Sequence, residues 1–421
     1  MEKFIEKTEA NTGDYAGIEV DMDQAAQIEP ESIPVSPLSR NVALLFAIAC
    51  GLAVANIYYA QPLLDSLSSE FGITHSSIGI VITITQVCYA MGLLLLVPLG
   101  DLLNRRWLIV SQMTLSVLAL IVVGIAHSST MLFIGIAMVG LLAVVTQALV
   151  AFAATLSASA DRGRIVGLVT SGIVIGILLA RTFAGILTDL AGWRYVYLVS
   201  ALLTLIMAGI LFRVLPHYDQ ERESLSYLQL LRSVIMLFVH ERILRIRAVL
   251  ALLIFTAFSI LWTSLVLPLS APPLSLSHTA IGAFGLAGVA GALAAARAGR
   301  LADLGLGQRT TGAALFMLLV SWLPISYAKH SLLALIVGII LLDLAIQAVH
   351  VTNQSMIFTV RPEARSRLTA GYMIFYSIGS ATGSIASTRI YEYSGWNGVC
   401  LLGAIVSAAA LLFWSLTRRL H

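Results

Sequence analysis

The chain has 421 residues, of which 58% are hydrophobic and only 11% are charged, and its mean hydropathy is +0.91. Soluble domains carry about 25% charged residues, so this composition excludes a water-soluble protein and places most residues against lipid or other apolar helices. The net charge of +3, without a long basic run, argues against nucleic acid as a partner. Residues 1–40 combine nine acids with three basic residues and lack an apolar core, which predicts a disordered acidic tail without a secretory signal.

The apolar runs after this tail have the length of membrane spans. A helix needs about 20 apolar residues to cross the hydrocarbon core of a bilayer. This criterion predicts an all-α membrane protein with twelve transmembrane helices. In the first half we expect spans at 41–65, 77–99, 107–126, 130–157, 165–187 and 194–214. In the second half we expect spans at 248–270, 280–298, 310–328, 331–356, 369–388 and 397–416.

The basic residues predict the orientation of these spans. An even number of spans puts both termini on one side of the membrane, and nineteen arginines lie on that side. The other side carries only Arg194, Lys329 and Arg389. By the positive-inside rule the first side is cytoplasmic. We therefore expect a multi-pass protein of the bacterial cytoplasmic (inner) membrane with both termini in the cytoplasm.

The two halves of the chain repeat each other with a period of 203 residues. Ile73-Thr-His-Ser-Ser-Ile-Gly79 reappears as Leu276-Ser-His-Thr-Ala-Ile-Gly282, and Tyr59 corresponds to Trp262. Parallel repeats of this kind form two pseudo-symmetric six-helix bundles that rock around a site between them; a duplication kept only for stability is the alternative. The predicted parts are a tail over 1–40, bundles over 41–214 and 248–416, a cytoplasmic linker over 215–247 and a cytoplasmic tail over 417–421.

Two loops repeat an acid followed by basic residues. The first is Val97-Pro-Leu-Gly-Asp-Leu-Leu-Asn-Arg-Arg106 and the second is Gly299-Arg-Leu-Ala-Asp-Leu-Gly-Leu-Gly-Gln-Arg309. An acid near helix N-terminal amides is favoured by the helix dipole, whereas an ordinary positive-inside turn would explain only the arginines. The pattern resembles the loop signature of the major facilitator superfamily. This resemblance implies a conformational latch formed by Asp101, Arg105, Arg106, Asp303 and Arg309.

The fifth span carries a second motif, Gly172-Ile-Val-Ile-Gly176, followed by Arg181. It resembles the glycine-rich fifth-helix motif of the drug:proton antiporters of this superfamily, with Ile177 in place of the usual proline. Ile136 stands where the antiporter pattern of span four has an arginine. Small residues four apart also let helices approach closely, so we expect helix packing first and exporter identity second. The resemblance extends over residues 41 to 416.

Two charged residues lie well inside the predicted spans, Arg181 and Asp343. Charges at this depth are costly and mark functional positions. His350 follows Asp343 at helical spacing and shares its face. We predict that Asp343 carries a coupling proton, with His350 as a second titratable group and Arg181 as a modulator. The alternative is a fixed ion pair between Arg181 and Asp343, although at 1.5 Å per residue their depths differ by roughly 10 Å.

Other polar and aromatic residues of the spans are candidates for a substrate cavity. The resemblance implies that helices one, four, seven and ten line the central pathway, and most of the candidates lie on these helices. Aromatic residues in such positions also serve as packing. The predicted cavity residues are Asn56, Tyr59, Gln86, Tyr89, Gln147, Thr256, Ser259, Trp262, Thr263, Gln347, Asn353 and Gln354.

The sequence contains no nucleotide-binding glycine loop and no zinc-type cluster, so we expect neither an enzyme nor a cofactor or metal. It predicts a secondary transporter that exports a small organic solute in exchange for protons and acts as a monomer in membrane lipid. Proton-coupled uptake is the alternative within transport. A membrane sensor or a lipid-handling protein on the same scaffold is the alternative from another class. Short tails disfavour the sensor, and the polar face of span ten disfavours the lipid-handling protein.

Overall fold

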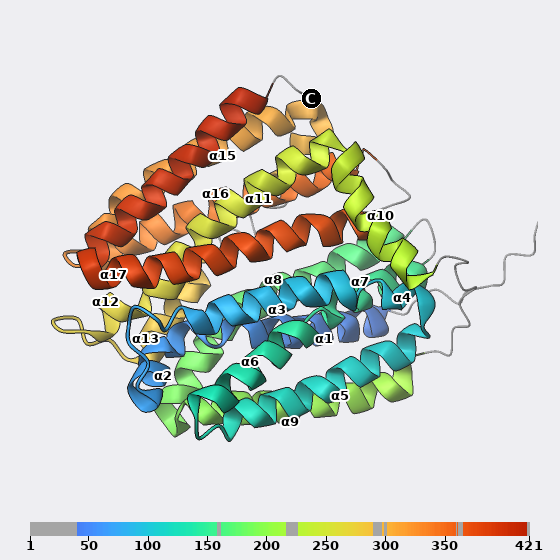
Figure 1. Cartoon of the computed structure of the whole chain (residues 1–421), viewed down its shortest axis with the longest axis horizontal. Coiled ribbons are helices and arrows are strands. Elements are labelled where there is room, and N and C mark those ends of the chain that lie inside the picture. The colour runs from blue at the N-terminus through green and yellow to red at the C-terminus, as the bar shows by residue number, and fades with distance from the viewer. Residues whose placement is uncertain are drawn as a thin grey trace, which may run out of the picture. The chain divides into compact units, whose positions relative to one another are not determined.

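The computed structural model describes residues 40–157, 161–215, 226–288, 297–298, 301–358, 360 and 365–418, and every regular element in them is a helix (Figure 1). Nine helices of this described part are long and apolar enough to cross a membrane. In hydrocarbon a helix satisfies all backbone hydrogen-bonding groups within its own segment, which is why long apolar runs form helices here. The prediction of an all-α membrane protein is confirmed.

The helices of the first half follow the predicted spans, with breaks. Span 41–65 divides at the 3-10 turn that contains Pro62, and span 130–157 divides near Ala143. The elements are α1 (Arg40–Tyr58), η2 (Gln61–Leu63), α2 (Leu64–Phe71), α3 (Ile80–Leu95), α4 (Leu99–Leu102), α5 (Arg105–Gly124), α6 (Ser129–Leu142), α7 (Val145–Thr155), α8 (Arg162–Ala191) and α9 (Trp193–Val214).

The second half begins with an additional helix and ends with a kinked one. Gly395 has φ 58° and ψ −156°, which interrupts α17 between the predicted eleventh and twelfth spans. The elements are α10 (Tyr227–His240), α11 (Arg242–Ser264), α12 (Val266–Ser270), α13 (His278–Ala283), η3 (Phe284–Gly288), η4 (Ala302–Leu306), α15 (Gly307–Ser326), α16 (Leu332–Phe358) and α17 (Arg365–Thr417). Residues 289–296 of span 280–298 lie outside the described residues, and the count of twelve stays a prediction.

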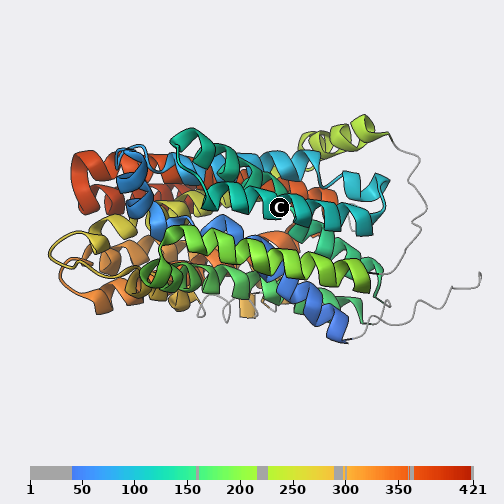
Figure 2. The ribbon, with the colours of Figure 1, turned by 90° about the horizontal axis from the view of Figure 1, so that it is seen from below.

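The predicted linker over 215–247 is corrected by the structure at its C-terminal side. Ser226 and Gln229 form a capping box at the start of α10, and α10 lies at the right-hand edge in Figures 1 and 2. The next helix, α11, begins at Arg242. Arg247, which the sequence analysis assigned to the linker, is therefore part of a helix and is fully buried.

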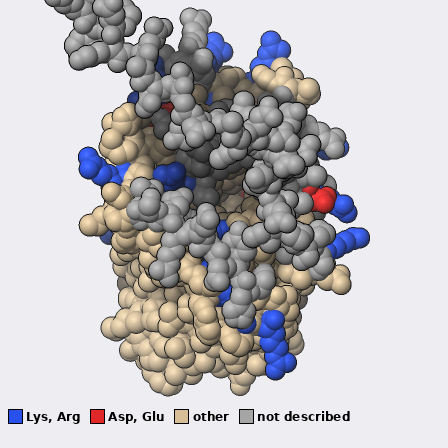
Figure 3. All heavy atoms as spheres, turned by 90° about the vertical axis from the view of Figure 1, so that its right-hand side faces the viewer, with Lys and Arg blue, Asp and Glu red and all other residues tan. Residues whose placement is uncertain are grey.

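Basic side chains gather at one end of the helices. Figure 3 looks at the right-hand end of Figure 1, where several Lys and Arg side chains surround the rim and few acidic ones are visible. This end carries the starts of α5 and α11, with Arg105, Arg106, Arg242 and Arg245. That this side faces the cytoplasm stays a prediction from the sequence; under it, we refer to the opposite end, with α2 and α13, as the outer end.

Glycines set how closely the helices approach. α1 packs against α8, where a Cβ on Gly172 would lie 2.0 Å from the carbonyl oxygen of Ala47. The two halves meet where α3 packs on α17 and where α8 packs on α13 and η3. At the latter junction a Cβ on Gly185 would lie 2.2 Å from the carbonyl oxygen of His278. The packing role that we expected for Gly172 accordingly fits the structure, since no side chain has space at these positions.

Candidate functional site

Arg181 and Asp343 meet on opposite sides of Trp262. Asp343 on α16 and Arg181 on α8 are 6% and 3% exposed. The indole nitrogen of Trp262 donates to Asp343 Oδ1 at 3.2 Å, and the guanidinium carbon of Arg181 lies 3.8 Å from the centroid of the same ring. Between these two described side chains the structure contains no ion pair; the indole of α11 connects them instead. The contact is therefore indirect, unlike the fixed ion pair that we considered as the alternative.

The guanidinium of Arg181 is surrounded by aromatic rings and one amide. Its Nε donates to Gln61 Oε1 at 2.9 Å, and its carbon lies 5.3 Å from the Tyr58 ring and 5.5 Å from the Phe258 ring. Cation–π contacts of a desolvated guanidinium are worth about 2 kcal/mol. Gln61 reaches the cluster because the turn at Pro62 ends α1. Neither Gln61 nor Tyr58 was predicted, since each looks in the sequence like an ordinary helix-end residue.

A chain of aromatic residues leads from this cluster to His350. The hydroxyls of Tyr58 and Tyr376 form a hydrogen bond that joins α1 to α17, and the Tyr376 ring lies 3.9 Å from the Phe255 ring. His350 Nδ1 is 2.9 Å from the Tyr372 hydroxyl. His350 is thus held by α17, two helical turns from Asp343 on the same face of α16. The spacing predicted this shared face but not the tyrosines that continue the chain.

Arg247 forms a second buried polar cluster that the sequence analysis missed. Its Nη1 donates to Asn353 Oδ1 at 3.2 Å and to Thr311 Oγ1 at 3.4 Å. Asn353 was predicted to line a cavity, and here it accepts a hydrogen bond from this arginine. The continued apolar pattern after Arg242 could have identified α11, but the neighbouring arginines indicated a loop.

The other predicted cavity residues divide into two sets. In the first set the polar atoms contact neighbouring helices. The Ser200 hydroxyl on α9 donates to Asn56 Oδ1 at 2.7 Å and lies 3.4 Å from the Tyr59 hydroxyl, while Thr256 Oγ1 donates to the Gly379 carbonyl on α17 at 3.1 Å. These contacts join helices to one another, because buried hydroxyl and amide groups need partners.

The second set lies on α3, α7, α11 and α16. Tyr89 is hydrogen-bonded to the Gln147 side chain, and Gln86 Oε1 is buried without a hydrogen-bond partner. The hydroxyls of Ser259 and Thr263 are 3.2 Å apart. Gln347 and Gln354 are half-buried on α16.

Of the predicted latch residues, the structure describes the side chains of the arginines. Arg105 Nε donates to the Gly100 carbonyl at 3.0 Å, and its Nη1 donates to Thr155 Oγ1 on α7 at 2.5 Å. Arg106 donates to the Phe212 carbonyl on α9, and its guanidinium carbon lies 4.9 Å from the centroid of the Phe212 ring. The start of α5 is thereby attached to α7 and α9. Arg309 is exposed on α15, and the side chains of Asp101 and Asp303 lie outside the described residues.

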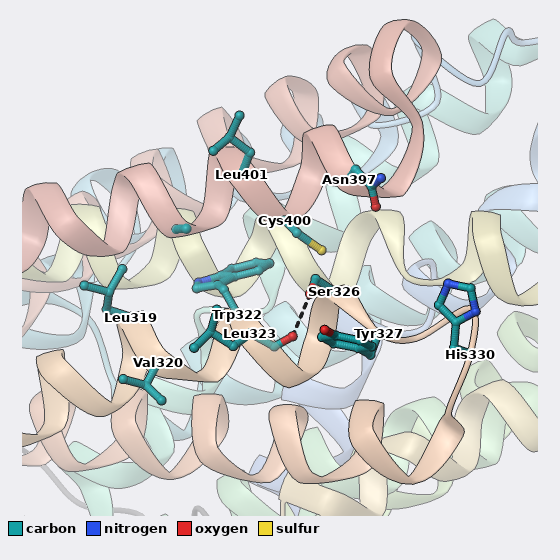
Figure 4. A pocket seen from close by; sticks show the side chains of 11 residues that line it. Leu319, Val320, Trp322, Leu323, Ser326, Tyr327, His330, Asn397, Cys400 and Leu401 are labelled. Atoms are coloured by element: carbon teal, nitrogen blue, oxygen red, sulfur yellow. Dashed lines mark hydrogen bonds between the residues drawn. The ribbon is translucent and has the colours of Figure 1, made fainter.

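A separate pocket of about 580 Å³ lies between α15 and the C-terminal part of α17 (Figure 4). Its lining is mostly apolar and includes none of the predicted site residues. The lining residues are Leu319, Val320, Trp322, Leu323, Ser326, Tyr327, His330, Asn397, Cys400, Leu401 and Ala404.

Known proteins of similar structure share this arrangement of helices. A crystal structure of a bacterial homolog of the human lysosomal transporter Spinster, inward-facing and unoccupied, superposes with a TM-score of 0.74 at 13% identity. It covers 91% of this chain and 98% of its own. The nucleoside transporter NupG superposes with a TM-score of 0.66 at 14% identity, over 88% of this chain and 99% of its own. At these identities the likeness shows the fold alone.

Sequence comparisons identify the family. The uncharacterized transporter YgaY of Escherichia coli O157:H7 is 49% identical over 381 residues, which cover 90% of this chain and 96% of YgaY. The inner membrane transport protein YnfM of Escherichia coli is 28% identical over 192 residues, 41% of this chain and 42% of YnfM. The pattern of the Major Facilitator Superfamily matches residues 45–323 and 247–421. The chain therefore belongs to the Major Facilitator Superfamily and is a membrane transporter rather than an enzyme.

Proposed function

We propose that this transporter exports a small organic solute in exchange for protons, with Asp343 as the proton carrier and Arg181 as its modulator. The observation that carries the proposal is the burial of both side chains without a direct ion pair between them. A direct pair would neutralise both charges permanently. Because Trp262 separates them, Asp343 can bind or release a proton while Arg181 stays charged. Protonation of Asp343 then alters the electrostatic field at Arg181.

The position of the cluster supports coupling between protonation and conformational change. Arg181, Tyr58 and Gln61 belong to the first predicted bundle, whereas Asp343 and Trp262 belong to the second. Rocking of two such bundles gives alternating access in transporters with parallel repeats. A proton at Asp343 therefore acts on contacts that cross the junction, and His350 would serve as a second titratable group further along α16.

The solute class is proposed from the polar groups on the same helices. Buried Gln86 and Tyr89 together with half-buried Gln147 suit a small organic ligand, since ligand sites are mostly apolar with a few polar groups. The glycine motif of α8 resembles that of drug:proton antiporters and favours export over uptake. We further propose a monomer in the bacterial inner membrane, in line with the two Escherichia coli relatives.

The test is solute-dependent proton movement in proteoliposomes that contain a pH-sensitive dye. A panel of drug-like compounds and metabolites is added to the wild type, to Asp343→Asn and to the control Asp161→Asn, an exposed carboxylate at the start of α8. We expect proton flux with at least one solute in the wild type and the control, and none in Asp343→Asn. The sign of the flux separates exchange from co-transport. Undiminished flux in Asp343→Asn would refute the role of Asp343.

A further inference from the structure

At the outer end, His278 connects the two halves through carboxylates on both sides of its ring. His278 opens α13; its Nε2 lies 3.2 Å from Asp65 Oδ1 and 3.0 Å from Ser66 Oγ on α2. Its Nδ1 lies 3.1 Å from Asp189 Oδ1 on α8. A neutral imidazole carries one N–H, and only the imidazolium can donate from both nitrogens. Two carboxylates on opposite ring nitrogens therefore select protonated His278.

The carboxylate of Asp189 is held in place by the backbone of α13. The amide of Thr279 donates to Asp189 Oδ2 at 2.7 Å, and the amide of His278 donates to Oδ1 at 3.2 Å. Amides at a helix start favour an ionised acceptor. Next to this contact, the backbone of α8 at Gly185 packs directly against the backbone of His278 on α13. We name the two acids and His278 the outer clasp; within it, Asp189 and His278 lie on elements whose backbones approach closely at Gly185.

The charges around the outer clasp favour the imidazolium. The hydrogen bond to Asp65, followed by the charges of Asp65 and Asp189, raises the pKa of His278 above its ordinary value of 6.5, although partial burial opposes this. Among the elements packed against α13, α8 also carries Arg181, whose guanidinium lies in the Trp262 cluster. On α2 the remaining acid, Glu70, is paired with Arg194 and accepts from Trp193 Nε1. The described elements η2, η3 and α12 carry no charged residue.

The internal repeat supplies a comparison within the same molecule. The counterparts of His278 and Asp189, 203 residues away, are His75 and Glu392, and both are exposed. In the described part of the chain they make no hydrogen bond with each other. The junction of α3 and α17 is joined by neutral groups instead, where Ser384 Oγ donates to the Gly79 carbonyl at 2.9 Å. Among the residues that the structure describes, only one of the two related junctions therefore carries a clasp that can gain or lose charge.

We propose that the outer clasp is a proton-operated gate, in which protonated His278 holds the outer ends of the two halves together and loss of its proton lets them separate. Opening moves His278 on the second half away from both acids, which lie on the first half. The contribution of the clasp is therefore fully present below pH 6.5 and is lost as the pH rises through the raised pKa. The closed-to-open ratio changes about tenfold for each unit by which closure raises this pKa. The gate rests on alternating access but not on Asp343 as the proton carrier.

The test measures the opening of the outer end directly. Spin labels on the exposed positions Ser69 of α2 and Lys329 after α15 report the distance between the halves by double electron–electron resonance in lipid nanodiscs. The full-length protein is used with its three native cysteines replaced by alanine. We expect short distances at pH 5.5 and a growing population of long distances up to pH 8.5. A distance distribution that does not change with pH in the parent protein would overturn the proposal.

Variants identify the group that senses the pH. His278→Gln cannot titrate, so the distances between its spin labels should be independent of pH. His278→Lys keeps a cation at this position, so its spin-label distances should stay short over the whole pH range. His75→Gln is the matched control from the repeat and should behave as the parent does. A pH response that survives in His278→Gln would exclude His278 as the sensor. Asp343→Asn should also keep the pH response, and loss of the response in this variant would assign the gate to Asp343. If the wild type showed the pH response but no proton flux with any solute, only the proposed function would be refuted.

Discussion

The contact between α8 and α1 at Gly172 provides a quantitative test of the packing. Gly172 of α8 faces the backbone of Ala47 on α1, and a Cβ there would lie 2.0, 2.5 and 2.7 Å from its carbonyl oxygen, carbonyl carbon and Cα. Ordinary contacts begin at 3.4 Å, so Gly172→Ala forces the two helices apart by more than 1 Å. Gly167 lies on the same helix, is exposed, and has nothing within 4 Å of such a Cβ. Gly167→Ala is therefore the matched control.

The expected effects of the two substitutions have opposite signs. Alanine gains about 0.5–1 kcal/mol over glycine within a helix. Overpacking costs about 1–3 kcal/mol, and at Gly172 the obstacle is backbone rather than a flexible side chain. We expect Gly172→Ala to lose about 1–2 kcal/mol and Gly167→Ala to gain up to about 1 kcal/mol.

The assay is thermal unfolding of the purified protein in detergent, followed by tryptophan fluorescence at one fixed scan rate. A fixed rate is needed because unfolding of large proteins is often irreversible and the apparent Tm then depends on the rate. Gly172→Ala should melt below the wild type and Gly167→Ala at or above it. If both variants melted at or above the wild-type temperature, the close approach of α1 and α8 would be refuted.

Two further substitutions test the buried polar clusters by the same assay. Trp262→Phe keeps a ring for Arg181 but removes the donor to Asp343, so we expect a loss of about 1–3 kcal/mol; an unchanged Tm would mean that this hydrogen bond does not contribute. Asn353→Leu removes one of the two acceptors that Arg247 Nη1 contacts, and because a hydrogen bond to a charged group contributes about 1.5–3 kcal/mol we expect a loss of this size. An unchanged Tm in Asn353→Leu would indicate that Arg247 satisfies this donor elsewhere.

Much of the fold could be read from the sequence because hydrocarbon allows few solutions. Apolar runs without charges must be helical, so helices such as α16 lie close to their predicted limits. The same scarcity of charge marked Arg181 and Asp343 as embedded, and helical spacing placed His350 on the face of Asp343. Arg247 was assigned to the linker although it lies in α11. Several arginines close together in the sequence indicate a loop, even where they occupy the first turns of a helix.

The contacts of these residues depended on the tertiary structure, since they join segments that are distant in the chain. Periodicity shows that Asp343 faces the interior, but the packing of α11 and α8 places Trp262 between it and Arg181. Asp65 and His278 are separated by 213 positions, and no local pattern relates a carboxylate of α2 to an imidazole of α13. Sequence alone thus determined which residues enter the membrane, through the cost of burying charge, while helix packing decided which of them meet.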